Sequence, residues 1–301
     1  MTTNRKAVLF TLLSGVFFGT SGTAQAIGPA GLTPMSVSAA RLICGGILLA
    51  ALMPTQGHKL REVLPLFRMP SAYIAAACVC LFQIFYFTAT ARAGVALGTL
   101  IAMGSMPLIT GLIGTIFGHK ISSAWFIATL VCVLGLILLA RDGIASGSVL
   151  GIVSAVLSAT AGAGFNLAVK YMLDQNRSAL PSLVTVFLIA AILMVPIAAT
   201  QPLNWVASAS GLSLILWLGL VTMAIPNIFW LTGIGHLSPG TTATLVLGEP
   251  FTATLLGVFV LHETLELPAI IGLFLVLFGI VMLGYVEART PKSQVAATNH
   301  I

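Results

Sequence analysis

Long apolar runs recur along the whole chain, and short stretches rich in glycine, proline and charged residues separate them. Each run is about 20 residues long, so a helix rising about 1.5 Å per residue can cross a hydrocarbon core of about 30 Å. The pattern therefore predicts an all-α integral membrane protein with ten transmembrane helices. The expected spans are 7–27, 34–53, 71–90, 95–117, 122–140, 148–170, 180–200, 211–233, 240–261 and 267–285.

Three pairs of segments resemble each other at offsets of 140 to 144 residues. These pairs are 14–22 with 154–162, 83–89 (QIFYFTA) with 227–233 (NIFWLTG), and 104–119 with 247–262. The chain thus divides into two five-helix repeats, 1–143 and 144–288, followed by a cytoplasmic tail at 289–301. Because five is odd, the second repeat must enter the membrane from the opposite side, so the repeats are predicted to be inverted.

Composition and charge fit this interpretation. Apolar residues make up 58% of the 301 residues and charged residues only 7%, whereas about a quarter of the residues in soluble domains are charged. One set of alternate loops and tails holds Arg5, Lys6, Lys59, Arg61, Arg68, Lys120, Lys170, Arg177, Arg289 and Lys292; the other holds only Arg92 and Arg141. The positive-inside rule then predicts that both termini are cytoplasmic. The net charge of +6 reflects this topology, and we expect no nucleic-acid partner.

The start of the chain has a second interpretation. Arg5 and Lys6, the apolar run after them and the small residues Ala24 and Ala26 also resemble a cleavable signal peptide. Because residues 14–22 have a counterpart at 154–162, we expect the first span to be retained.

Amides and aromatic rings recur together inside the apolar spans. Gln83 and Asn227 are each followed three residues later by a ring, Tyr86 or Trp230, and residues three apart share a helical face. We expect these four residues to bind substrate from two similar walls of a cavity. Alternatively, the amides hold neighbouring helices together by hydrogen bonds.

The sixth span carries the same combination. Phe165 and Asn166 follow Gly162 and Gly164, which permit close helix approach or a kink. Substrate binding by Phe165 and Asn166 and plain helix packing are both open interpretations.

Two charged residues lie in the interior of predicted spans, where a charge costs at least a few kcal/mol unless it is paired or solvated. Arg41 either pairs with a substrate carboxylate or reaches the outer interface, about 10 Å from Pro34. Glu249, between Gly248 and Pro250, either binds a proton, a cation or a substrate ammonium group, or is a neutral structural acid. Met106 occupies the equivalent position in the first repeat.

His119 and His262 match in the repeat but fall at span ends. This position favours hydrogen-bonded interface residues over proton carriers, although the ordinary pKa of histidine suits proton transfer.

Residues 247–265 (LGEPFTATLLGVFVLHETL), with Ile271–Gly272 and Phe278–Ile280, resemble the last two helices of drug/metabolite transporters of the EamA type. The resemblance extends over essentially the whole chain. It implies ten helices, a central cavity and export of small metabolites, with exporters of aromatic amino acids as the most similar members. The family often ends its fourth and ninth helices with an acid, whereas Lys120 stands opposite Glu263 here, which argues against a shared role for these positions.

We therefore expect a transporter of the cell inner membrane, not an enzyme, that exports amino acids and similar zwitterions by alternating access. The four cysteines fall inside predicted spans, and we expect neither a metal nor a cofactor. Without an ATPase domain, transport must be facilitated or coupled to an ion gradient, for which protons are a candidate. One alternative is a drug or organic-cation/proton antiporter that uses Glu249. Another is a membrane enzyme acting on lipids, although the clustered acids or histidines that it needs are missing.

Overall fold

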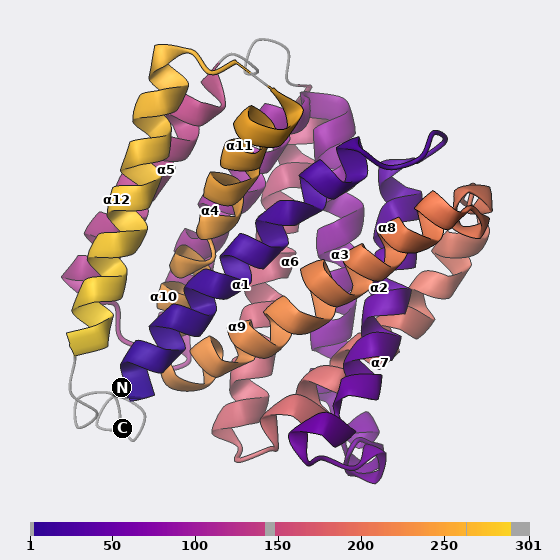
Figure 1. Ribbon diagram of the computed structural model, residues 1–301. Coiled ribbons are helices and arrows are strands. Elements are labelled where there is room, and N and C mark those ends of the chain that lie inside the picture. Colours follow the sequence, from indigo (N-terminus) through magenta and orange to yellow (C-terminus); the bar gives the residue numbers. More distant parts are fainter. Residues whose placement is uncertain (1–2, 142–147, 263, 290–301) are drawn as a thin grey trace.

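In the computed structural model, residues 3–141, 148–262 and 264–289 are described, and within these ranges the chain is helical and has no strand (Figure 1). The α-helices are α1 (Thr3–Ala26), α2 (Pro34–Leu52), α3 (Pro70–Ala93), α4 (Val95–Ile116), α5 (Ser123–Leu139), α6 (Val149–Asp174), α7 (Ala179–Ala199), α8 (Ala209–Gly219), α9 (Ile225–His236), α10 (Pro239–Leu245), α11 (Gly248–Leu261) and α12 (Leu267–Arg289). Shorter helical turns are η1 (Pro54–Gln56), η2 (Leu60–Glu62), η3 (Leu64–Arg68), η5 (Asn204–Ala207) and the π-helix η6 (Leu220–Ala224).

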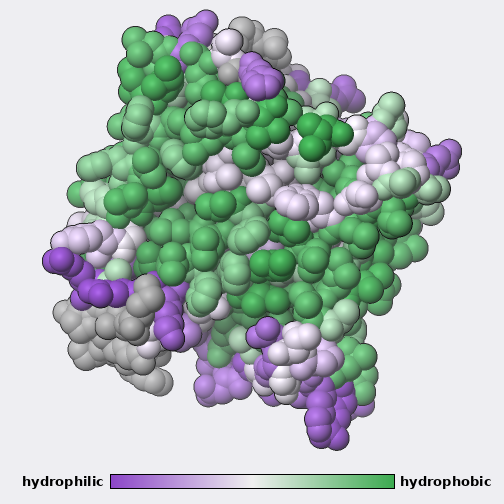
Figure 2. Space-filling view, in the orientation of Figure 1, coloured by the Kyte–Doolittle hydropathy of each residue, from purple (hydrophilic) through white to green (hydrophobic). Residues whose placement is uncertain are grey.

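The outside of the bundle is suited to lipid. Among the described residues, nine helical segments are long and apolar enough to cross a membrane, counting α8 to α9 as one and α10 to α11 as one. The helix α5 is apolar but shorter, with 17 residues. Figure 2 shows a broad hydrophobic surface, with hydrophilic residues gathered towards the ends of the bundle. Ile116, Val149 and Phe259 are 79%, 78% and 73% exposed, which would be unfavourable in water.

The chain is therefore a multi-pass membrane protein. Each of the ten predicted spans coincides with a helix or a pair of consecutive helices, but a count of ten membrane crossings stays a prediction. The boundary between the predicted repeats at 143/144 lies outside the described residues, as do Glu263 and all of the predicted tail except Arg289.

The two predicted halves pack against each other through matched pairs of helices. The helix α3 lies on α6 and α9 lies on α1; α4 packs on α6 and α11 on α1; α2 meets α7, and α5 meets α12. At the last contact, a Cβ atom added to Gly135 would lie 2.6 Å from the carbonyl oxygen of Gly272, so only glycine allows this approach. If each helix is replaced by its counterpart in the other half, the same set of contacts results. The inversion of the repeats stays a prediction.

Two spans of the second half are interrupted at prolines. The π-helix η6 comes directly before α9, whose second residue is Pro226. The break between α10 and α11 is followed by Pro250 in the first turn of α11, where the missing N–H has no helical partner in any case. In the first half, by contrast, Pro107 lies inside the continuous helix α4.

The helix α1 begins and α12 ends at the same end of the bundle (Figure 1). The turns η1 to η3, which connect α2 to α3 and carry Lys59, Arg61 and Arg68 at or beside them, also lie at this end. This end is the one that the charge distribution predicts to face the cytoplasm.

Candidate functional site

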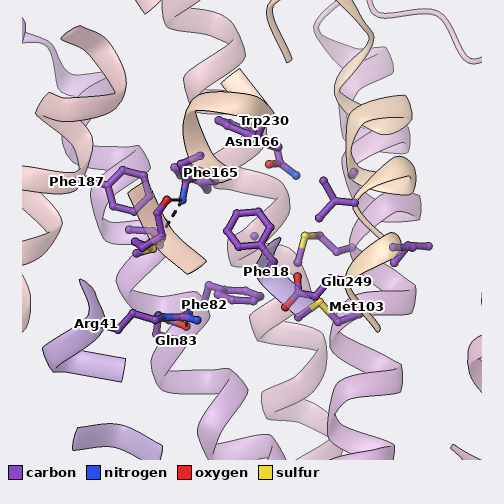
Figure 3. A pocket seen from close by; sticks show the side chains of 18 residues that line it. Phe18, Arg41, Phe82, Gln83, Met103, Phe165, Asn166, Phe187, Trp230 and Glu249 are labelled. Carbon is purple, nitrogen blue, oxygen red and sulfur yellow. Dashed lines mark hydrogen bonds between the residues drawn. The ribbon is translucent and has the colours of Figure 1, made fainter. Parts of the chain in front are cut away.

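A cavity lies in the middle of the bundle (Figure 3), and the centre of a water molecule can occupy about 150 Å³ of it. Its walls come from both predicted halves. Of the eight residues predicted to bind substrate or carry charge, seven line it, namely Arg41, Gln83, Phe165, Asn166, Asn227, Trp230 and Glu249. Amides and charges from distant parts of the sequence therefore share one site.

Tyr86 is the one of these eight residues that does not line the cavity, and its role in binding stays a prediction. Its hydroxyl group lies 2.8 Å from the hydroxyl oxygen of Thr99 on α4, and its ring stacks on Phe82 at a centroid distance of 5.8 Å. A tyrosine hydroxyl that is partly shielded from solvent needs a hydrogen-bond partner, and Thr99, which does not line the cavity either, supplies one. Phe82, which the sequence did not single out, takes the aromatic position on this wall.

Arg41 on α2 lines the cavity. Its Nη2 atom donates to Oε1 of Gln83 over 3.5 Å, and its Nε atom has no hydrogen-bond partner. The ion pairs of the described residues join His58 to Glu62 and both His119 and Lys170 to Asp174, so none includes Arg41. A weakly bonded guanidinium group in such a wall is suited to receive an anion.

Glu249 contributes the opposite charge from the first turn of α11. The partial positive charge of a helix N-terminus stabilises a carboxylate there. The helix α1 packs closely behind it, because a Cβ atom added to Gly19 would lie 2.6 Å from the carbonyl oxygen of Glu249. No hydrogen bond or ion pair within the described residues engages the carboxylate, and Figure 3 shows it across the cavity from Arg41.

The two predicted amides differ in what they bind. Gln83 is 2% exposed and accepts from Arg41. Asn227 donates from Nδ2 to the carbonyl oxygen of Met223 over 2.7 Å, within its own span. Met223 lies in the π-helix η6, where helical hydrogen bonding is altered, so the donor of Asn227 stabilises this irregular turn.

Aromatic rings form one apolar wall. Phe165 stacks on Trp230 with centroids 5.1 Å apart and planes at 22°, and Phe187 meets Phe165 edge-on at 6.0 Å. Phe18 projects into the same space from α1 (Figure 3). Such rings provide a large apolar contact area for a ligand.

Sequence reasoning missed several residues of the wall. Phe18 lies in the repeated segment 14–22, so the repeat pattern was a usable signal for it, whereas Phe82 lies one residue before the repeated segment 83–89. Phe187, Met103 and Met223 had no such signal, because apolar residues of these types are equally common in helix packing.

A second ionic cluster lies away from the cavity. Nζ of Lys170 is 3.0 Å from Asp174, and Nε2 of His119, in the connection between α4 and α5, is 3.9 Å from the same carboxylate. Burial, followed by the positive charge of Lys170, lowers the pKa of His119 below its ordinary value. His119 therefore prefers its neutral form at this position.

Comparison with known proteins identifies a matching family, a relative and a similar structure. The model of the EamA-like transporter family matches it twice, at residues 5–141 and 149–285. The uncharacterized transporter YwfM of Bacillus subtilis (strain 168) is 32% identical over 297 residues, which cover 97% of each chain. A crystal structure of a further protein superposes with a TM-score of 0.80 at 20% identity, covering 94% of this chain and 98% of that one, and shows likeness of fold alone.

Proposed function

This chain belongs to the EamA-like transporter family, and we propose that it carries small zwitterionic metabolites, chiefly amino acids with sizeable apolar side chains. One observation carries the proposal. Arg41 and Glu249 face the same cavity, and neither forms an ion pair within the described residues. A ligand with one anionic and one cationic group compensates both charges at once, which reduces the cost of desolvating them.

The surrounding groups fit the remaining parts of such a ligand. The carboxylate lies at Arg41 and Gln83, where a guanidinium group and an amide can both donate. The ammonium group lies at Glu249, and the apolar side chain lies against Phe165 and Trp230.

Alternating access is the proposed mode of transport, and the difference between the two ends of the bundle supports it. At the end where α1 begins, α4 contacts α10 through Gly111 and Gly240, with Trp125 packed beside both. At the other end, a cavity of about 470 Å³ is lined by the end of α1 and by α8, together with Leu256 of α11. Two halves that exchange these closed and open arrangements expose one site to each side in turn.

We propose export across the inner membrane. The family resemblance supports the direction, and the basic residues at one end of the bundle support its orientation, with Lys59, Arg61 and Arg68 on the cytoplasmic side.

A second candidate function is exchange of an organic cation for protons. It is favoured by the unpaired carboxylate of Glu249 close to aromatic rings, which attract cations. It leaves Arg41 without a role, because a guanidinium group in the wall repels a cationic ligand.

Counterflow in proteoliposomes separates these functions. The purified protein is offered labelled phenylalanine, a nucleoside or a cationic dye, each with and without a proton gradient. We expect amino-acid counterflow, reduced at least about tenfold in Arg41→Gln, because hydrogen bonds to charged groups contribute about 1.5–3 kcal/mol. Arg92→Gln is the matched control, since Arg92 is exposed and does not line the cavity.

The contrary result is equally specific. If only the dye is exchanged, with a dependence on the proton gradient that Glu249→Gln abolishes, the protein is a cation antiporter and the amino-acid proposal fails.

A further inference from the structure

The carboxamide of Asn166 on α6 faces the cavity and has no hydrogen-bond partner within the described residues (Figure 3). Asn166 is only 5% exposed and lines the cavity. Gln83 and Asn227, the other two amides of the wall, both form hydrogen bonds within the described part of the chain, and Asn166 forms none there. A carboxamide in the cavity wall whose donors and acceptor are not used by the protein can bind a polar group of a ligand.

The position of Asn166 defines which part of a ligand it meets. In Figure 3, the ring of Phe18 lies between Asn166 and the carboxylate of Glu249, and Trp230 lies beside Asn166. An amino acid whose charged groups are held at Arg41 and Glu249 would therefore extend its side chain past Phe18, and the far end of that side chain would reach Asn166.

We propose that Asn166 selects substrates whose apolar side chain ends in a hydrogen-bonding group, such as a phenol, an indole N–H or an amide. This inference rests on the proposed function and narrows its substrate class. A carboxamide both donates and accepts, so it suits each of these groups. A side chain with a purely apolar end leaves the carboxamide buried and unpaired, and sites built to bind a hydroxyl group discriminate strongly against analogues without one.

Tyrosine and phenylalanine test the inference because they differ by a single hydroxyl group. Each is measured as a competitor of labelled tyrosine counterflow in proteoliposomes. We expect the wild-type protein to prefer tyrosine by about tenfold or more, the lower part of the range that such a hydrogen bond provides. In Asn166→Leu, which is similar in size but apolar, the preference should fall to within about twofold.

Two further variants make the result interpretable. Thr160→Val removes a polar group from an exposed position on the same helix outside the cavity, and it should keep the wild-type preference. Asn166→Ala removes the carboxamide without adding bulk, so it should lose the preference even if the leucine variant folds poorly.

The outcomes distinguish failure of this inference from failure of the proposed transport function. Equal competition by tyrosine and phenylalanine in the wild-type protein, or an unchanged preference in both Asn166 variants, overturns the role of Asn166 and leaves amino-acid transport standing. If the wild-type protein exchanges neither amino acid, the proposed function itself fails.

Discussion

Two segments match in sequence, 83–89 on α3 and 227–233 on α9, but their amides and aromatic rings contribute differently to the cavity. From the first, the amide of Gln83 accepts from Arg41, while Tyr86 does not line the cavity and pairs its hydroxyl group with Thr99. From the second, the ring of Trp230 faces the cavity, while the amide donor of Asn227 is used by its own backbone. Both amides line the cavity, but only that of Gln83 bonds to a charged group there, and only the second segment adds a lining ring.

The local backbone explains the difference between the amides. The helix α3 runs unbroken from Pro70 to Ala93, whereas α9 follows the π-helix η6 and begins with Pro226 at its second residue. The altered hydrogen bonding of η6 provides a carbonyl group that takes the donor of Asn227. Gln83 meets no such carbonyl and reaches across to α2.

The two halves also differ in the charged residues that they contribute to the cavity. Glu249 and Met106 occupy equivalent positions in the sequence, but only α11 begins a new helix there. An asymmetric pair of charges on a repeated framework can bind a dipolar ligand in one orientation. Similar sequences thus position a segment in the bundle, while local breaks and neighbours decide which side chains face the substrate.

Among substitutions in the two matched segments, the largest effect is expected from replacing the amides. Gln83→Leu should raise the half-saturation concentration for amino acids about tenfold, because a hydrogen bond to a charged group contributes about 1.5 kcal/mol or more. Asn227→Leu should change it by less than about twofold and should instead lower the melting temperature by a few degrees, as loss of about 1 kcal/mol implies.

Counterflow kinetics and thermal unfolding in detergent measure the two quantities. Equal kinetic effects of the two substitutions would show that both amides bind substrate, as the sequence pattern alone suggests.

A smaller effect is expected from the rings. Trp230→Leu should raise the half-saturation concentration about fivefold, because ring stacking contributes about 1 kcal/mol beyond buried area. Tyr86→Phe keeps the ring that stacks on Phe82 and removes only the hydrogen bond to Thr99, so it should leave substrate affinity unchanged. A loss of affinity in Tyr86→Phe would place this hydroxyl group at the substrate after all.

The smallest effect concerns the matched histidines. Because the pKa of His119 is lowered, the unfolded chain takes up a proton first as the pH falls below the ordinary value of 6.5, so His119 then reduces stability. His119→Gln should remove this contribution and lessen the fall in melting temperature between pH 7.5 and 5.5 by roughly 1–2 °C.

His262 is exposed and serves as the control, because His262→Gln should follow the wild-type pH dependence. If His119→Gln also follows it, His119 is not held in its neutral form by its surroundings.

Much of the fold was predictable, since a run of about 20 apolar residues has few stable alternatives to a membrane helix. Gly248 and Pro250 also indicate a helix break before α11 from the sequence alone. The link from Arg41 to Gln83 was not predictable, because it depends on how α2 and α3 meet in space. The hydrogen bond between Tyr86 and Thr99 was not predictable for a similar reason, since Thr99 lies on another helix.

The central claim is that Arg41 and Glu249 bind the two opposite charges of one ligand. Its most direct test compares tyrosine with its decarboxylated amine and its deaminated acid as competitors of amino-acid counterflow. We predict that each single-charge analogue competes roughly 100-fold less well than tyrosine, because each leaves one charged group of the wall without a partner. An amine that competes as well as tyrosine would contradict the claim, because the carboxylate would then contribute nothing to recognition.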